Sequence, residues 1–258
     1  MTKPEENRFE DFFNDDFYVL LKNHLYNYRL RRQAVRKWVP FKEEGLTLEV
    51  GSGLSPMLEG NGQVVYSDLS FSALKSLQRL QKGGIYLEAD ALRLPFKNGS
   101  FSTVVCSEVL EHLPDDLAAL KEIARVMARD GALILTFPHR RFYFANDDRF
   151  VSHYRRYEIN EIEEKLKDAG LEISVIQKVL GPLEKITMMA VIFFVSPFSR
   201  FKKRQAKPAE SAPMKRKVIA PIFKMFNLFY SLLVWFDARI FPRKLASVIL
   251  LKAIKRGK

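Results

Sequence analysis

Apolar and polar residues alternate in two distinct periods along the first two thirds of the chain. Short apolar runs predict strands, which fall at 46–50, 64–68, 84–89, 102–107, 132–138 and 171–177. Apolar residues spaced by three and four predict helices over 16–38, 70–81, 115–131 and 159–170. Strands that alternate with helices in this way favour an α/β fold, with a doubly wound, mostly parallel sheet covered on both faces.

The pattern changes after residue 180. Apolar stretches at 186–198, 218–236 and 245–254 are interrupted by a basic, Pro- and Ala-containing linker at 202–217. The stretch 218–236 is marginal for crossing a membrane, because a spanning helix needs about 20 predominantly apolar residues and this one contains Lys224. Apolar pieces between Lys/Arg clusters favour amphipathic helices lying in a lipid headgroup layer. Packing over the core, as a lid around an apolar pocket, is the alternative.

This change of pattern divides the chain into three predicted parts. Residues 1–43 form an N-terminal helical cap, and 44–180 form the ligand-binding α/β domain. Residues 181–258 form a basic, apolar C-terminal segment that associates with a membrane or serves as a lid, and they give the fold a helical, amphipathic extension.

Charge is distributed as unevenly as hydrophobicity. The chain carries a net charge of +12, yet residues 197–258 alone hold 16 Lys/Arg against two acidic residues. Such a tail is typical of segments that meet phosphates, on a membrane or on nucleic acid. Because the basic residues interleave with long apolar runs, an anionic membrane surface is the favoured partner, and nucleic acid is the less favoured one.

Cysteine use and the N-terminal sequence bear on the compartment. Cys106 is the only cysteine, which excludes a disulfide framework and a cysteine metal cluster and favours a reducing compartment. The N-terminal sequence is acidic and lacks the apolar core of a secretory signal. We therefore expect a cytoplasmic protein, peripheral at the inner face of the membrane.

The turn after the first predicted strand, LEVGSGLSP (48–56), has the composition of a nucleotide-binding turn. Gly51 and Gly53 would let a ligand approach the backbone, and the start of a following helix would offer free N–H groups. A dinucleotide fingerprint needs a third glycine where Pro56 stands, and Glu49 would repel a pyrophosphate. The Glu49 carboxylate favours a ligand with a cationic sulfonium amino acid, either by direct attraction or by fixing the loop. NAD therefore fits this turn less well than such a ligand.

Acidic residues close the next strands in the same order. Asp68 ends the second strand, where a carboxylate can accept hydrogen bonds from both hydroxyls of an adenosine ribose. Asp90 follows the third strand and could accept from the adenine amino group, while the Ala91 N–H donates to the ring. The stretch VVCSEVLEHLPDD (104–116) follows the fourth strand, where the reactive end of such a ligand would face its acceptor.

Together these motifs resemble the class I S-adenosylmethionine-dependent methyltransferases, and among them the type 11 methyltransferase-domain family, over about residues 44–177. The resemblance implies a Rossmann-like methyltransferase fold, an enzyme, and S-adenosyl-L-methionine as cofactor. The residues it places at the cofactor are Glu49, Gly51, Ser52 and Gly53 at the methionine end, Asp68 and Leu69 at the ribose and adenine, Asp90 and Ala91 at the adenine, and Ser107 near the amino acid moiety. Two positions depart from the family pattern: Glu49 replaces the usual Asp, and Ser55 replaces the third glycine, which implies a different turn.

Methyl transfer from a sulfonium is an in-line displacement, so the enzyme mainly aligns the partners and accepts a proton from the acceptor. The candidate bases are His112 first and His153 second, although a lone histidine is more often structural. Glu108, Glu111 and His112 stand at i, i+3 and i+4, so a helical turn would put them on one face.

With His153, these three residues resemble the metal site of small-RNA terminal ribose methyltransferases, and ubiquinone-pathway O-methyltransferases have a similar stretch. A divalent ion there would acidify an acceptor hydroxyl. Because the stretch is common in methyltransferases not known to need a metal, we predict that none is bound.

The sequence therefore predicts an S-adenosylmethionine-dependent methyltransferase that acts on an apolar or lipid-linked small molecule, such as an isoprenoid, a quinone or a lipid precursor, at the membrane surface. Two alternatives stay open. One is an RNA methyltransferase that uses the basic tail for phosphate, and the other is a non-catalytic, cofactor-binding membrane subunit.

Overall fold

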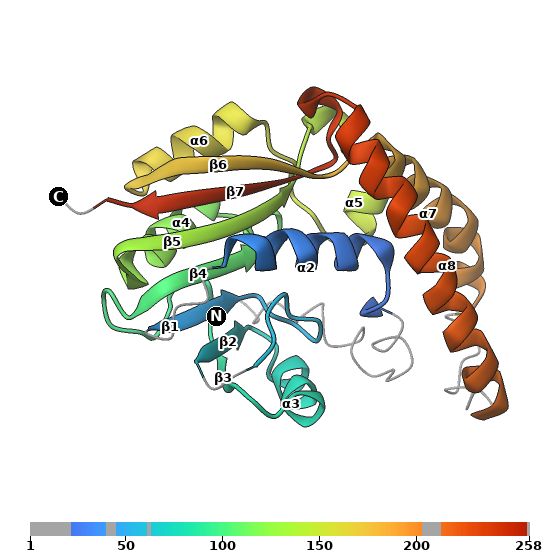
Figure 1. Ribbon diagram of the computed structural model, residues 1–258, viewed down its shortest axis with the longest axis horizontal. Helices are drawn as coiled ribbons and strands as arrows, with labels where there is room; N and C mark the ends of the chain where they lie inside the picture. The colour runs from blue at the N-terminus through green and yellow to red at the C-terminus, as the bar shows by residue number, and fades with distance from the viewer. Residues whose placement is uncertain (1–21, 40–44, 61–62, 203–212, 257–258) are drawn as a thin grey trace, which may run out of the picture.

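The computed structural model describes residues 22–39, 45–60, 63–202 and 213–256 (Figure 1). Seven strands form one sheet in the order β3-β2-β1-β4-β5-β7-β6. The strands are β1 (Leu46–Val50), β2 (Val64–Asp68), β3 (Ile85–Glu88), β4 (Phe101–Ser107), β5 (Met127–Pro138), β6 (Leu171–Leu180) and β7 (Val248–Lys255). Among these described strands, β7 alone runs opposite to the common direction, because it pairs antiparallel with both β5 and β6. The predicted α/β fold with a mostly parallel sheet is confirmed.

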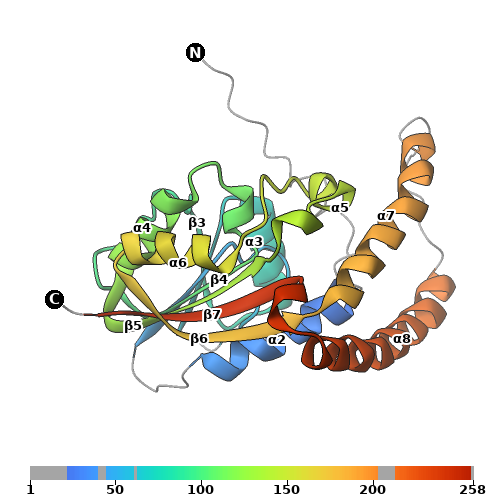
Figure 2. The same ribbon diagram turned by 90° about the horizontal axis from the view of Figure 1, so that it is seen from above.

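Helices cover both faces of this sheet (Figure 2). They include α2 (Tyr26–Trp38), α3 (Phe71–Leu80), α4 (Asp116–Val126), α5 (Asn146–Phe150), α6 (Ile159–Asp168), α7 (Pro182–Lys202) and α8 (Pro213–Ile240). One core cluster joins α4 and α6 to one face of the sheet, and a second joins α2, α3 and α8 to the other. Of the predicted N-terminal cap, residues 1–21 and 40–43 lie outside the described residues, and α2 confirms the helical pattern of the rest.

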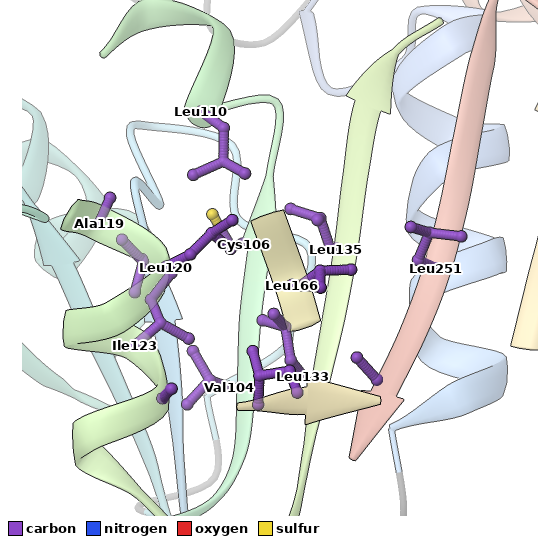
Figure 3. Close-up of a cluster of buried hydrophobic side chains, with 14 of the residues drawn as sticks. Val104, Cys106, Leu110, Ala119, Leu120, Ile123, Leu133, Leu135, Leu166 and Leu251 are labelled. Carbon is purple, nitrogen blue, oxygen red and sulfur yellow. The ribbon is translucent and has the colours of Figure 1, made fainter. Parts of the chain in front are cut away.

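The cluster under α4 and α6 fixes the central strands. Its labelled members include Val104 and Cys106 of β4, Leu133 and Leu135 of β5, Leu120 and Ile123 of α4 and Leu166 of α6 (Figure 3). Each buried leucine or isoleucine of this kind is worth about 1.5–3 kcal/mol of transfer free energy. Burial raises the pKa of the Cys106 thiol, so this cysteine has the environment of a structural residue and not of a reactive one.

The helix predicted over 115–131 ends early. It leaves the helical path after Val126, and β5 begins at Met127, which pairs with Phe101 of β4. Met127 is fully buried. Sheet pairing and burial of this side chain outweigh the helical stop signal at Gly131.

The prediction of a headgroup-layer helix at 245–254 is wrong. Residues Val248–Lys255 form β7, which lies between β5 and β6, and Ile249, Leu250 and Leu251 are 0% exposed. An apolar run that is buried on both faces of a sheet shows no alternation, so periodicity alone does not distinguish it from a helix. The sheet therefore takes a strand from beyond residue 180, and the helices of the C-terminal segment are an insertion between two of its strands.

That insertion is a pair of helices, α7 and α8, which we call the hairpin. Figures 1 and 2 show it leaving the sheet at the end where the parallel strands finish, with the two helices in contact near the domain and spread apart beyond it. The predicted helical C-terminal extension is thus confirmed for this part. Residues 203–212 of the predicted linker lie outside the described residues, and 213–217 belong to α8. Among the helices that the structure describes, none has the length and apolar character needed to cross a membrane.

Candidate active site

The turn that follows β1 requires glycine at two positions for different reasons. Gly51 and Gly53 have φ of +69° and +53°, a left-handed backbone that side chains disfavour. A Cβ on Gly51 would lie 2.4 Å from Cγ2 of Val109. A Cβ on Gly53 would meet no atom closer than Oδ2 of Asp68, at 4.0 Å. Gly51 is therefore needed because Val109 packs against its Cα, whereas the backbone of Gly53 is accessible to a ligand beside Asp68.

The Glu49 carboxyl holds the loop after this turn. It is 2% exposed and accepts hydrogen bonds from the N–H groups of Met57 (2.6 Å) and Leu58 (3.1 Å). Burial raises the pKa of Glu49 to about 7, against the effect of these two hydrogen bonds. Of the two roles predicted for Glu49, the structure shows the fixing of the loop.

The helix expected directly after the turn is not found. In the described residues from Gly51 to Gly60 the chain makes turns and bends. The sequence here contains glycine, serine and Pro56 in close succession, which disfavours helix formation. Free N–H groups of a helix N-terminus are therefore not what this turn offers a ligand.

Two serine hydroxyls in the loop are buried without a partner. Ser52 and Ser55 are each 4% exposed, and neither Oγ has a hydrogen-bond partner among the described residues. An unsatisfied buried hydroxyl costs about 1–3 kcal/mol, so the pair marks a place where a polar ligand would complete the loop. Together with the open side of Gly53, these hydroxyls fit the amino acid end of the implied cofactor.

Asp68, at the end of β2, faces the glycine turn. Its Oδ2 accepts the Gly53 N–H at 2.8 Å, and its Oδ1 accepts the Ser70 N–H at 2.9 Å. Burial raises the pKa of Asp68, and these two hydrogen bonds oppose the rise. Each oxygen keeps a lone pair, so the carboxylate can still accept from ribose hydroxyls as predicted.

Of the residues predicted to meet the adenine, Leu69 and Asp90 are exposed to solvent, whereas Ala91 is partly buried against the core. Leu69 is 58% exposed, which leaves an apolar surface free to pack on a planar base. Asp90 is exposed after β3, and its Oδ1 accepts the Leu92 N–H at 2.9 Å, which fixes the turn that carries Ala91.

At the end of β4, side chains from three elements meet. The Ser107 hydroxyl hydrogen-bonds to that of Thr136 on β5 at 2.8 Å, and Thr136 donates to Glu108 at 3.1 Å. Glu108 has a φ of +55°, a conformation that costs a non-glycine residue about 1–2 kcal/mol. Its Oε2 lies 3.2 Å from a guanidinium nitrogen of Arg31 on α2.

Beyond Glu108, a short 3₁₀ turn, Leu110–His112, brings three predicted residues together. The candidate ligand atoms of Glu111, His112 and His153 all lie within 4.8 Å of one another. Glu111 is fully buried, and neither of its carboxyl oxygens has a hydrogen-bond partner among the described residues. The three side chains could therefore hold a metal ion, whereas Glu108, the fourth member of the predicted set, faces Arg31. The absence of a metal stays a prediction.

Burial sets the protonation of this cluster. It raises the pKa of Glu111 well above its usual value, with the nearby Glu108 charge adding to the effect. It lowers the pKa of His112 to about 4, and the neighbouring His153, with ring centroids 4.7 Å apart, adds to that effect. His112 is therefore neutral at pH 7.

His153 is oriented by a buried charge network. Its Nδ1 lies 3.0 Å from Oδ1 of Asp148, which also accepts from Arg156 at 2.7 Å. The other Asp148 oxygen accepts from Lys185, near the start of α7, at 2.7 Å, and Lys185 also binds Asp147. Burial alone would raise the pKa of Asp148, but the hydrogen bond from His153 and the Arg156 charge hold it below its usual value.

Two contributors to the site, Arg31 and Lys185, were missed in the sequence. Arg31 precedes the buried Ala34 and Val35 by three and four residues, so it lies on the buried face of α2, and that spacing was the available signal. Lys185 is 1% exposed, yet its partners lie nearly 40 residues earlier in the chain, and no local pattern predicts the pairing.

The chain matches the methyltransferase-domain family (Methyltransf_11) over residues 48–135. An uncharacterized protein of Methanocaldococcus jannaschii is 34% identical over 96 residues, which cover 36% of this chain and 41% of that protein. The ubiquinone/menaquinone biosynthesis C-methyltransferase UbiE of Coxiella burnetii is 31% identical over 97 residues, which cover 35% of this chain and 39% of that protein. The chain thus spans about two fifths of the length of these curated relatives.

Solved structures extend the likeness to the whole fold. A structure from Thermotoga maritima, described as an S-adenosylmethionine-dependent methyltransferase and possible histamine N-methyltransferase, aligns with a TM-score of 0.59 at 18% identity, over 96% of this chain and 98% of that one. At this identity the alignment shows the fold alone. By sequence and fold, the chain is homologous to class I S-adenosylmethionine-dependent methyltransferases.

Proposed function

This chain carries a methyltransferase domain of class I type, and from that premise we propose that it transfers a methyl group from S-adenosylmethionine to an apolar or lipid-linked small molecule at a membrane surface. The Coxiella relative is named as a C-methyltransferase of ubiquinone/menaquinone biosynthesis, and this supports an acceptor of this kind. The membrane part of the proposal rests on α8.

The cofactor-binding half of the site follows the residues described above. When bound, S-adenosylmethionine supplies an electrophilic methyl group on a sulfonium. The unpartnered hydroxyls of Ser52 and Ser55 and the open backbone at Gly53 would hold its amino acid end. Asp68 would accept from its ribose, and Leu69 would cover one face of its base.

The acceptor half lies beyond Ser107. Asp148 orients the His153 ring through Nδ1, which leaves Nε2, 3.8 Å from Oε1 of Glu111, as the nitrogen able to take a proton. His112 stays neutral beside it because of its lowered pKa, so it does not repel the charge that His153 acquires. We assign the base to His153 and a positioning role to His112.

The single observation that carries the membrane part is that the outward face of α8 is apolar, while the face that it buries with Val234 is partly polar. The residues that it buries against the domain include Asn227, Ser231 and Asp237. Its outward residues Ile222, Met225, Phe226, Phe229, Leu232, Leu233, Phe236 and Ile240 are each 53–74% exposed. A surface helix normally places its apolar stripe inward, and an apolar patch of this extent marks an interaction surface.

Two of the buried polar residues of α8 bond to neighbouring helices, one to α2 and one to the start of α7. Asn227 accepts the backbone N–H of Tyr26 on α2 at 3.1 Å, and Asp237 accepts that of Leu183 on α7 at 3.1 Å. These bonds fix the rotation of the helix, so the apolar face cannot turn inward without losing them. Exposed cations such as Lys224 and Arg239 on the same helix favour an anionic bilayer as the surface that covers it.

Incubation with radiolabelled S-adenosylmethionine, followed by separation of host lipid, RNA and soluble metabolites, tests the activity. We expect label in the lipid extract, lost in Asp68→Ala and reduced about 100-fold or more in His153→Gln, as is usual for loss of a general base. Asp168→Ala, an exposed carboxylate at the end of α6, is the matched control and should keep full activity. Label in RNA would contradict the proposal, and cofactor binding without transfer to any fraction would favour the non-catalytic alternative.

Vesicle flotation tests the membrane contact separately. Phe226→Gln/Phe229→Gln removes two outward side chains of α8 and should strongly reduce binding to mixed anionic vesicles. Leu80→Gln/Ile85→Gln, which alters two side chains of α3 and β3 that are also more than half exposed, should not. Equal flotation of both double variants would contradict the role of α8. If the wild type did not float and instead formed a dimer or bound a partner protein through α8, the membrane contact would be ruled out.

A further inference from the structure

A groove of ≈ 350 Å³ lies at the domain end of α8. Its walls come from the last turn of α2, the middle of β6, the last residues of α8 and the turn that follows it. The lining residues are Lys37, Ile176, Gln177, Lys178, Ala238, Arg239 and Arg243. Four of these seven are cations.

None of the four cations forms an ion pair with a carboxylate among the described residues. Lys178 instead donates to the backbone carbonyls of Arg239 and Phe241, which ties β6 to the end of α8. Capping of a helix C-terminus accounts for Lys178 by itself. The same effect favours Lys37, which lies in the last turn of α2. It does not explain why Lys37, Lys178 and Arg243 line one groove, where their like charges repel one another unless an anion lies between them.

The two tryptophans of the chain flank the groove. The Arg239 guanidinium lies 3.2 Å from the centroid of the Trp235 ring, and the Lys37 ammonium lies 5.2 Å from that of Trp38. Tryptophan rings with one apolar side and one polar edge are enriched at the level of lipid headgroups. A cation held against such a ring is also stabilised at the level of the lipid headgroups, where the ring face and the anionic headgroups are both close to it.

The groove is continuous with the apolar face of α8. Arg239 follows Phe236 by three residues and Leu232 by seven, so the three side chains share one helix face. Phe236 and Leu232 are 55% and 53% exposed. The stripe that would lie among acyl chains therefore ends in a cationic groove, at the place where a headgroup would lie.

We propose that this groove binds the phosphate of an anionic phospholipid headgroup, while the acyl chains of that lipid lie along the apolar face of α8. The proposal rests on the membrane contact proposed above and adds to it a defined site. An RNA backbone would also supply phosphates, but it would leave the adjoining apolar stripe in water. The lipid satisfies both surfaces at once.

The test compares the full-length chain with Lys37→Gln/Arg243→Gln on phosphatidylcholine vesicles with and without phosphatidylglycerol. A basic residue near an anionic surface contributes about fivefold to binding, so we expect the double variant to bind the anionic vesicles at least about tenfold more weakly. Its binding to neutral vesicles should not change. The control, Lys75→Gln/Arg79→Gln on α3, removes the same charge from a surface away from the hairpin and should lose less than about twofold.

Trp fluorescence provides a readout at the groove itself. Phosphatidylglycerol with a nitroxide on its headgroup should quench Trp38 and Trp235 in the wild type, and the groove variant should reduce this quenching.

Unchanged S-adenosylmethionine affinity in both double variants will show that they are folded. Equal losses in the groove and control variants would overturn the proposal, because charge alone would then explain binding. Displacement of the vesicles by a single-stranded RNA at matched ionic strength would overturn it in favour of nucleic acid.

These outcomes are distinguishable from failure of the proposed activity. Vesicle binding and quenching need neither a methyl acceptor nor turnover. A chain that binds anionic headgroups through this groove but transfers no methyl group would keep the groove proposal and remove the enzymatic one.

Discussion

Gly51 and Gly99 share a left-handed backbone, with φ of +69° and +73°, but differ in their neighbours. An added Cβ at Gly51 would lie 2.4 Å from Val109, whereas at Gly99 its nearest contact is 4.0 Å away. Both alanine variants should lose about 1–2 kcal/mol of unfolding free energy from the backbone alone. Only Gly51→Ala should also weaken S-adenosylmethionine binding, by about tenfold or more, which corresponds to 1.4 kcal/mol or more. Calorimetric titration of both variants checks this, and equal affinities would show that the turn does not contact the cofactor.

His112 makes stability depend on pH in a predictable direction. Burial and His153 lower its pKa from 6.5 to about 4, so between these values the unfolded chain binds a proton that the folded chain does not. The resulting stabilisation is complete above about pH 6.5 and is lost as the pH falls toward 4. The shift corresponds to about 3 kcal/mol at most. Urea unfolding across this range should therefore give a shallower pH dependence for His112→Gln than for the wild type, and parallel curves would contradict the burial argument.

At the scale of single residues, the sequence predicted those parts of the site that follow a strand. Gly51, Gly53 and Asp68 could be found because the carboxyl ends of parallel strands meet at one edge, so order along the chain translates into proximity. Arg31 pairs with Glu108 across 77 positions, and nothing local to either residue encodes that contact. The prediction of a helix after Gly53 was wrong, because the Glu49 carboxyl accepts the N–H groups of Met57 and Leu58 and so holds this segment as a loop.

Among the elements, β7 gives the clearest test of how the last apolar stretch is used. Leu250 is 0% exposed, and the strand is hydrogen-bonded on both sides. Leu250→Ala should lower the free energy of unfolding by about 2–5 kcal/mol in the absence of lipid. Lys252→Ala, on the same strand but only partly buried, should change it by less than about 1 kcal/mol. Denaturant unfolding measures both, and a stable Leu250→Ala chain with impaired vesicle binding would restore the headgroup-layer interpretation.

The sequence predicted well those elements that bury one face and expose the other, because their apolar residues recur at a regular spacing. The segment 70–81 contains α3, because Ala73, Leu74 and Leu77 form one buried stripe and Ser70 caps its first turn. The stretches at 218–236 and 245–254 are both predominantly apolar, yet one is a helix with an apolar outer face and the other a central strand. Their difference lies in what covers them, and only the assembled fold supplies that information.

In the whole molecule, the hairpin and the acceptor site are joined by one buried side chain. Lys185, near the start of α7, donates to Asp147 and Asp148, and Asp148 in turn holds His153. Any movement of α7 on a membrane would therefore act on the network that orients the proposed base. The contact also explains why two acidic residues of the short helix α5 can be buried at 6% and 1% exposure.

Lys185→Met should break this connection at a large cost in stability. It leaves two buried carboxylates with Arg156 as their remaining cation, and loss of one partner from a buried ion pair typically costs about 3–5 kcal/mol. Lys165→Met is the matched control, because Lys165 is partly exposed and its partner Asp116 keeps Arg155 and Tyr157, so the cost should stay below about 1 kcal/mol. Hydrogen exchange should show lost protection in both α5 and the first turns of α7 for Lys185→Met, and in neither for the control. If α5 alone lost protection, the hairpin would be held independently of the acceptor site, and membrane contact would then serve to place the enzyme and not to adjust its base.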